Sequence, residues 1–417
     1  MCVESAHADE FDREPIRYST APANNAVSRL QERLDSGAAA LKFENDHGYL
    51  RSFLQALDVP ASSQMLVFSK TSMQRERITP KTPRALYFND DVYVGLCQQG
   101  AVLEISAVDP NLGTVFYTLD QEPTDRPKFT RQTDNCLQCH GSTQTRGVPG
   151  HLVRSVFADR SGQPILSMGG FRVDQTTPFA QRWGGWYVTG THGSQKHLGN
   201  LIVRGQREPE EIDNASGQNV KDLRDRLTIA SYLTPHSDLV ALLVLEHQTE
   251  MHNLIAKANL QTCVALHEEA ELNRELGRGA DYRSETTWRR IRSVGDPLVK
   301  YLFFSKEAPL TEKVQGTSSF AADFAKEGPR DPKGRSLREF DLQKRLFKYP
   351  CSYLVYTKAF DALPEPVKSY VYGRMNDVLT GRDYTRDFDH LSADDRQAIR
   401  EILLATKPEL AAAWREN

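Results

Sequence analysis

The sequence predicts an α+β fold, in which a β-rich region of antiparallel strands precedes a large, mainly α-helical region. Between residues 84 and 207, short runs of Val, Ile, Tyr and Phe alternate with turn residues, which is typical of hairpins. From about residue 210 the apolar spacing becomes helical and stays so to the end of the chain. We therefore expect a mostly helical segment at 1–83, a β-rich region at 84–207 and a helical domain at 208–417.

The N-terminal segment contains two predicted helices, at 25–37 and 48–57, because apolar residues recur there at helical spacing. Residues 85–120 then hold four short strands separated by the turn sequences Asn-Asp, Gln-Gly and Asp-Pro-Asn-Leu-Gly. We expect more strands within 151–171, around a turn at Asp-Arg-Ser-Gly, and at 184–193 and 198–205.

The helical region is expected to begin with one long helix of about forty residues, or with two nearly collinear helices. Thr234 and Pro235 match an N-cap followed by proline at the first helical position, and the pattern continues to about Leu276. Further helices are predicted at 286–304, 336–347, 365–379 and 392–404.

Charge and hydropathy argue against two classes of partner. The chain has 52 basic and 55 acidic residues, a net charge of -3, and no sustained basic run, so nucleic acid is not an expected partner. The longest apolar run, 239–245, is far shorter than the roughly 18 residues that a transmembrane helix needs. We therefore predict no transmembrane segment.

The segment NCLQCHGSTQTRGVPGH, residues 135–151, contains the order C-x-x-C-H at Cys136, Cys139 and His140. Covalent haem attachment needs this order, because two thiols add to the vinyl groups while the next imidazole binds the iron. Zinc binding or chance would explain the same letters. A thioredoxin-like C-x-x-C is disfavoured, because no apolar strand leads directly into the motif. We predict one covalent haem c.

In these five residues the chain resembles c-type cytochromes. Beyond them it is similar to uncharacterised bacterial proteins of comparable size that carry one such motif between a β-rich and a helical part. The resemblance implies a redox role and a periplasmic or extracellular location, because bacteria attach haem c outside the cytoplasm. The motif lies within a β-rich region, unlike that of small class I cytochromes, so their fold and axial-methionine position do not carry over.

The N-terminus lacks the basic and apolar parts of a secretory leader, so we expect that a leader has been removed. Cys2 would then suit a lipid anchor, or would be an incidental residue of a tail. Cys2, Cys97, Cys263 and Cys351 remain after haem attachment, and an oxidising compartment would allow disulfides among them, with the pairing open.

The sixth iron ligand decides what a haem protein does, since a carrier fills both axial sites and a catalyst leaves one open. Met168, in the segment SMGG, offers a thioether, or is a core methionine. His151, His192 and His197 follow the motif closely. Each alone reads as a loop histidine, but we expect at least one of the three to contact the haem.

The segment RWGGWYVTG places Arg182, Trp183 and Trp186 close together. The two tryptophans would form an aromatic wall against the porphyrin, and Arg182 would pair with a haem propionate. The alternative is a strand whose tryptophans fill the core.

Polar residues follow the apolar start of the long helix, including Glu246, His247, Glu250 and Met251. They could supply a distal haem ligand (His247 or Met251), a general acid–base pair (Glu246 or Glu250 with His247) or a second metal site. A polar contact between helices is the alternative. The spacing is not the Glu-x-x-His of di-iron bundles.

Three functions remain open on this basis. The first is a monohaem c-type cytochrome that passes electrons to or from a partner. The second is a haem enzyme for peroxide or small nitrogen oxides, with the helical domain forming the pocket and His247 and Glu246 handling protons. The third is a haem-based sensor. The roughly two hundred residues after the haem segment favour the enzyme, because an electron carrier needs only about a hundred.

Overall fold

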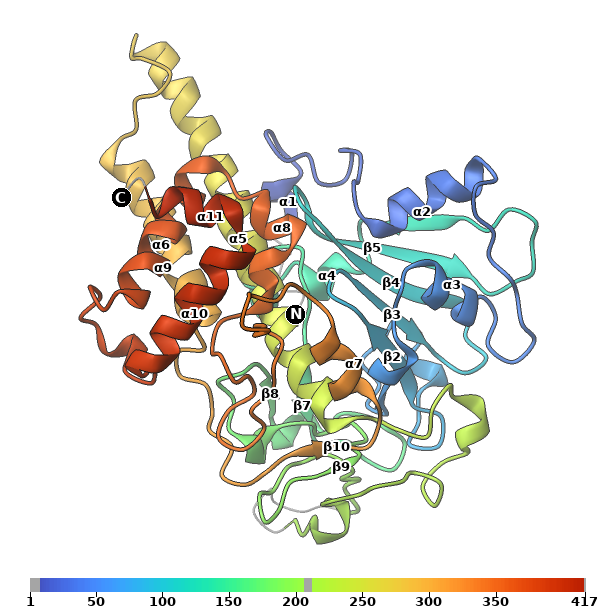
Figure 1. The fold of residues 1–417 in the computed structure, drawn as a ribbon. Helices are drawn as coiled ribbons and strands as arrows, with labels where there is room; N and C mark the ends of the chain where they lie inside the picture. The colour runs from blue at the N-terminus through green and yellow to red at the C-terminus, as the bar shows by residue number, and fades with distance from the viewer. Residues whose placement is uncertain (1–7, 206–211, 416–417) are drawn as a thin grey trace.

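The computed structural model describes residues 8–205 and 212–415 and confirms the α+β class. A six-stranded antiparallel meander, with the strand order β1-β2-β3-β4-β5-β6, precedes the helical region (Figure 1). The strands are β1 (Met65–Val67), β2 (Arg84–Phe88), β3 (Val92–Leu96), β4 (Val102–Asp109), β5 (Gly113–Asp120) and β6 (Phe129–Gln132). The four strands predicted within 85–120 are confirmed. Because β1 precedes residue 84, the boundary expected there falls within this sheet.

Two N-terminal helices cover one face of the sheet, and both were predicted. They are α2 (Ala26–Asp35) and α3 (Leu50–Ala56), with the short α1 (Ala8–Phe11) before them. The Asn25 side chain caps α2 by accepting hydrogen bonds from the Val27 and Ser28 amides. Val27 of α2 and Phe53 of α3 belong to one apolar cluster with sheet residues such as Tyr87. Alternate residues of each strand therefore point toward these helices.

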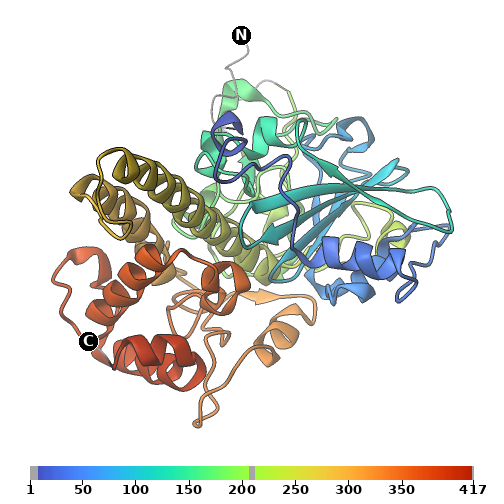
Figure 2. The same cartoon turned by 90° about the horizontal axis from the view of Figure 1, so that it is seen from above.

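The long helix α5 (Leu239–Glu275) runs from the centre of the molecule outward (Figure 2). It begins at Leu239, so the predicted start at Pro235 is wrong. Asp238 is the N-cap, since its carboxylate accepts hydrogen bonds from the Val240 and Ala241 amides. The proline lies in the irregular segment before this cap.

Shorter helices follow α5 along the chain and complete the helical region. They are α6 (Glu285–Leu302), α7 (Phe320–Lys326), α8 (Lys358–Asp361), α9 (Glu365–Leu379), α10 (Ala393–Thr406) and α11 (Pro408–Ala413). The helices predicted at 286–304, 365–379 and 392–404 are confirmed. The helix predicted at 336–347 is wrong, because the Asp341 carboxylate accepts the Gln343 and Lys344 amides and forms a turn. Leu342 has a φ of 55°, which a helix does not allow.

Residues 151–205 contain less strand than expected. β7 (Arg154–Val156) and β8 (Gly170–Arg172) form one pair, and β9 (Gly190–Thr191) pairs with β10 (Gln315–Gly316). The predicted strand at 198–205 is not formed, and residues 212–238 contain short 3₁₀ turns where helix was expected. Side-chain amides replace the regular ladder: Asn200 donates to the Val188 and Gly217 carbonyls.

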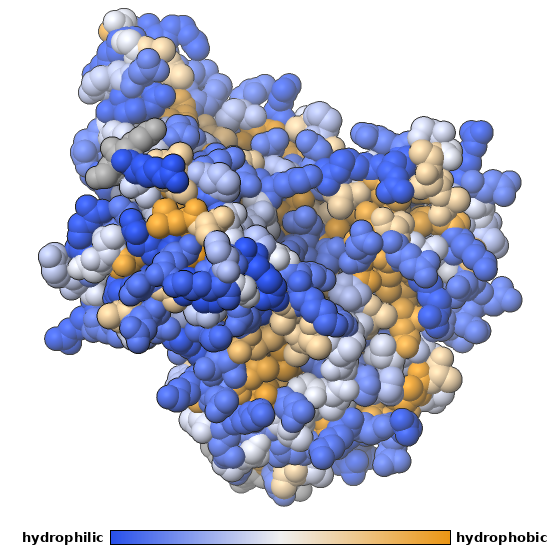
Figure 3. Space-filling model, in the orientation of Figure 1, coloured by the Kyte–Doolittle hydropathy of each residue, from blue (hydrophilic) through white to orange (hydrophobic). Residues whose placement is uncertain are grey.

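Hydrophilic side chains cover most of the face in Figure 3. Within the described residues, no helix combines the length and hydropathy that a bilayer crossing requires. Cys97, Cys263 and Cys351 are all free thiols, so the structure forms none of the disulfides considered for them. Cys2, the candidate for a lipid anchor, lies outside the described residues.

Candidate functional site

The C-x-x-C-H motif forms one short helical turn after β6. This turn is α4 (Leu137–His140), and the His140 amide donates to the Cys136 carbonyl. Leu137 is buried and fixes the turn to the apolar cluster of the sheet. Cys136 is half-buried, Cys139 is exposed, and both thiols are free. Two reduced thiols and an imidazole thus lie on one turn, and at least one thiol is open to solvent.

The imidazole of His140 has one nitrogen fixed by the backbone. Its Nδ1 lies 2.9 Å from the Gly150 carbonyl oxygen. A carbonyl only accepts hydrogen bonds, so Nδ1 carries the hydrogen and Nε2 keeps its lone pair. Burial lowers the pKa of His140, which keeps the ring neutral at pH 7. An iron-binding histidine is oriented in this way by its second nitrogen.

The loop that carries the Gly150 carbonyl is held by α5. The Asn253 side chain accepts the His151 amide and donates to the His151 carbonyl, each at 2.8 Å. A Cβ atom on residue 150 would lie 2.2 Å from the Asn253 Oδ1, so only glycine fits. Earlier in the same loop, Arg146 forms an ion pair with the buried Glu250 at 2.5 Å. Asn253 and Glu250 therefore position the carbonyl that orients His140.

The sheet supplies the surface beneath this loop. The Phe116 ring of β5 lies 4.9 Å from the His140 ring, centroid to centroid. On the same face, the Ser106 and Thr114 hydroxyls lie 2.9 and 3.3 Å from the two ring nitrogens of His151. Both nitrogens of His151 are therefore engaged inside the protein, although the residue lies near the motif as expected.

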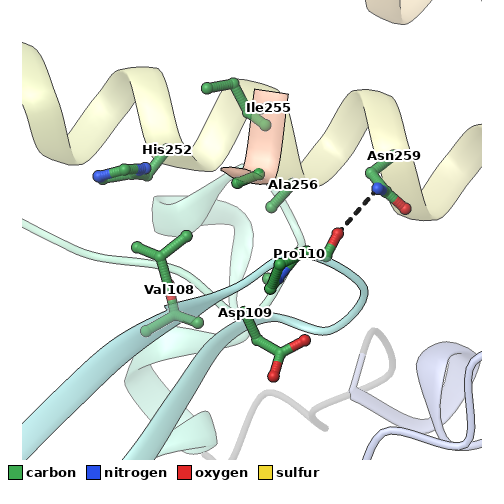
Figure 4. Close-up of a pocket in the computed structure, with 10 residues that line it drawn as sticks. Val108, Asp109, Pro110, His252, Ile255, Ala256 and Asn259 are labelled. Atoms are coloured by element: carbon green, nitrogen blue, oxygen red, sulfur yellow. Dashed lines mark hydrogen bonds between the residues drawn. The ribbon is translucent and has the colours of Figure 1, made fainter. Parts of the chain in front are cut away.

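His252 of α5 lies next to His151, with 6.1 Å between the ring centroids. Its Nε2 lies 2.8 Å from the Asp90 carbonyl, whereas its Nδ1 is buried and has no hydrogen-bond partner. Figure 4 shows His252 at one edge of a pocket of about 10 Å³ between α5 and the β4–β5 turn. Asn259 closes the other end by donating to the Pro110 carbonyl at 3.0 Å. Such a volume holds about one water molecule.

His192 and His197 lie together, but in a different cluster from the motif. Their ring centroids are 4.7 Å apart, and both rings contact Phe179. The His197 ring also lies 5.2 Å from Trp183. Within the described part of the chain, no hydrogen bond or ring contact joins either histidine to His140. Burial lowers the pKa of both residues, so they are neutral core side chains at pH 7.

Arg182 forms a buried ion pair with Glu246 at 2.7 Å. Its other guanidinium nitrogens donate to the Thr177 and Gln175 carbonyls. Burial raises the pKa of Glu246, and Arg182 offsets part of that effect. Arg182 is thus buried and paired with Glu246, whereas the sequence suggested that it would pair with a haem propionate.

Trp186 and Met168 lie on the β7–β8 side of the molecule. The Trp186 indole donates to the Arg154 carbonyl at 2.8 Å, and its backbone bridges Val67 of β1. Met168 ends a 3₁₀ turn, half-buried against a small apolar cluster around Phe157. Met168 is thus a partly exposed residue beside that cluster.

His247 is fully buried, and both of its ring nitrogens are engaged. Nδ1 lies 2.7 Å from the Gln175 Oε1, and Nε2 lies 2.8 Å from the Ser352 Oγ. The ring stacks on Phe304 at 4.4 Å, and burial lowers its pKa to about 3. The described residues contain no group of three or more His, Cys, Asp or Glu side chains arranged to hold a metal ion. His247 therefore makes polar contacts with Gln175 and Ser352, which lie outside helices, and not with another helix as the alternative supposed.

Sequence reasoning did not single out four residues that surround the motif: Phe116, Gly150, Asn253 and Arg146. Phe116 was visible only as an apolar residue of a strand, and its face is fixed by pairing with distant strands. Gly150 did carry a signal, since a glycine-rich loop followed the motif. Asn253 and Arg146 act through contacts across about a hundred residues, which no local pattern reveals.

The donor set fits a covalently bound haem. Two free thiols and a neutral imidazole with an available Nε2 are the groups that haem c requires. Cys136 and Cys139 would hold the porphyrin, and His140 would bind the iron, which would supply one-electron chemistry. The chain matches none of the family models, curated proteins or solved structures with which it was compared.

Proposed function

We propose that this chain is a monohaem c-type cytochrome that transfers electrons to or from a partner protein in the periplasm or outside the cell. The contact between the His140 Nδ1 and the Gly150 carbonyl carries the proposal. It leaves Nε2 free beside two free thiols, as the proximal side of a covalent haem requires. The location follows from the chemistry, because bacteria attach haem to this motif outside the cytoplasm.

An electron carrier is favoured over an enzyme by what surrounds the motif. His247 and Glu246, the candidate acid–base residues, are committed to Ser352 and Arg182 in the core. The helical region then serves as scaffold, since α5 holds the loop that orients His140.

A carrier also needs a strong sixth ligand. Met168 is our candidate, because the residue is only partly buried and is followed by Gly169, which has a φ of 76° and nothing within 4 Å of a Cβ position. His151 is a weaker candidate, because its two nitrogens are engaged by Ser106 and Thr114.

The test uses protein matured in a host that attaches haem c. We expect haem that survives acid-acetone extraction, and a low-spin reduced spectrum that carbon monoxide does not change. Cys136→Ala with Cys139→Ala should remove all covalent haem, whereas the control Cys263→Ala should retain it, because Cys263 lies on α5 outside the motif. Covalent haem in the double variant would refute the attachment site. A spectrum that changes with carbon monoxide would instead support an open iron face and the enzyme.

A further inference from the structure

One ion pair lies beside the haem motif on the sheet. Arg84 of β2 and Glu104 of β4 are 2.5 Å apart, and about one sixth of each side chain is exposed. Glu104 also accepts hydrogen bonds from Ser72 and Gln74. Within the described residues, the Arg84 guanidinium is hydrogen-bonded only to Glu104, through one of its nitrogens. A guanidinium has five N–H donors, so Arg84 can pair with a second anion.

Strand pairing places Glu104 close to the iron-binding histidine. Ser106 pairs with Phe116, and Glu104 pairs with Thr118, which is two residues farther along β5. Glu104 and Phe116 are therefore diagonal neighbours on one face, about 7 to 8 Å apart between backbones. The Phe116 ring contacts His140. Glu104 and Arg84 thus border the space beside that histidine.

A glycine allows Arg84 to reach across the sheet. Gly95 of β3 lies directly between Leu86 of β2 and Glu104 of β4. A Cβ atom there would lie 3.2 Å from the Leu86 side chain and 3.5 Å from the Arg84 side chain. Without that atom, the guanidinium of Arg84 crosses β3 and meets the carboxylate of Glu104.

Arg84 and Glu104 also lie within electrostatic range of His140, and Glu104 lies within electrostatic range of Cys136. This agrees with the placement given by the strand register.

Resting on the proposed haem c function, we propose that Arg84 binds a propionate of the haem and that Glu104 holds the guanidinium in place. Haem carries two carboxylates, and arginine is the side chain best suited to pair with a carboxylate. Arg182, which the sequence suggested for this role, is instead used by Glu246. Arg84 is thus a cofactor-binding residue, and Glu104 is a positioning residue.

The experiment measures the reduction potential of the loaded protein. A nearby cation favours ferrous haem, which carries one positive charge fewer, and a nearby anion favours ferric haem. Arg84→Gln should therefore lower the potential, Glu104→Gln should raise it, and Arg84→Lys should lie between Arg84→Gln and the wild type. The control is Arg51→Gln, because Arg51 lies on α3, which covers the other face of the sheet, and forms an ion pair there with Glu44. The control should leave the potential unchanged.

A second measurement is specific to the propionate. Without Arg84, the propionate pKa rises toward neutral pH, so the potential of Arg84→Gln should depend more steeply on pH between 5 and 8 than that of Arg84→Lys. Shifts of the same sign in Arg84→Gln and Glu104→Gln would overturn the proposal, because general damage to the ion pair would explain them. If Arg84→Gln does not fold, an unchanged or lower potential in Glu104→Gln overturns it. Failure of the wild type to hold covalent haem would instead refute the proposed function.

Discussion

His140 and His247 differ in how many ring nitrogens the protein already uses, and only His247 is fully buried. The Gly150 carbonyl takes one nitrogen of His140, whereas Gln175 and Ser352 engage both nitrogens of His247. Burial alone therefore does not make a histidine a candidate ligand. The motif was enough to select His140 from the sequence. The hydrogen bonds of His247 could not be predicted, because Gln175 and Ser352 are separated from it by 72 and 105 positions in the chain.

We predict that His247→Ala destabilises the protein without affecting a bound haem. The change leaves the Gln175 and Ser352 side chains without their partner and opens a cavity beside Phe304, which together should lower the free energy of unfolding by about 3 to 5 kcal/mol. Urea unfolding measures the loss, and the Soret band of the loaded protein reports on the iron. A shifted Soret band would contradict this prediction and return His247 to the iron.

At the scale of elements, α5 links the helical half to the haem loop. Its apolar start and its length were predictable, because no breaker interrupts the pattern. The first residue of α5 could not be predicted, because Thr234-Pro235 and Asp238 both match the pattern of a helix N-terminus. Only contacts in the folded protein select Asp238 as the N-cap. That carboxylate also accepts the Thr317 and Ser318 amides, far away in sequence. The same limitation explains the wrong helix at 336–347, where a local Asp341 turn competes with helix formation.

Asn253 is the residue of α5 whose substitution should best test the contact between this helix and the haem loop. Asn253→Ala removes two hydrogen bonds to the His151 backbone and leaves both backbone groups buried and unpaired, so we expect a loss of about 2 to 4 kcal/mol in unfolding free energy. Gln261→Ala, at a half-buried position on the same helix, is the matched control and should change stability by about 0.5 kcal/mol or less. Equal effects of the two substitutions would argue against a specific role for Asn253. Chemical denaturation of both variants gives the comparison.

At the scale of the whole molecule, the sheet and the helical half share a core that contains many titratable groups. The strands from 85 to 120 could be read from alternation and turns, whereas the neighbours that bury each histidine could not, because they come from distant parts of the chain. Burial lowers the pKa of His247 and His197 to about 3 and that of His252 to about 4. The opposite shift occurs in Glu307, where burial raises the pKa to about 7. These groups give stability a defined pH dependence.

We predict that stability rises as pH increases from 4.5 and levels off near pH 7. Below pH 6.5 the unfolded histidines bind protons that the folded ones do not, so acid favours unfolding, by about 3 kcal/mol at pH 4 for His252 alone. Glu307 acts with the opposite sign: the folded state binds its proton more tightly, and this stabilisation is lost as pH rises from 4.5 through about 7. The lowered histidines outnumber such carboxyls, so their effect prevails and stability rises between pH 4.5 and 7. Urea midpoints between pH 4.5 and 7.5 measure the profile, and Glu307→Gln should make the rise steeper, because it removes a group whose stabilisation is lost over the same range. A midpoint that does not change from pH 6.5 to 4.5 would mean that these histidines gain protons in the folded protein.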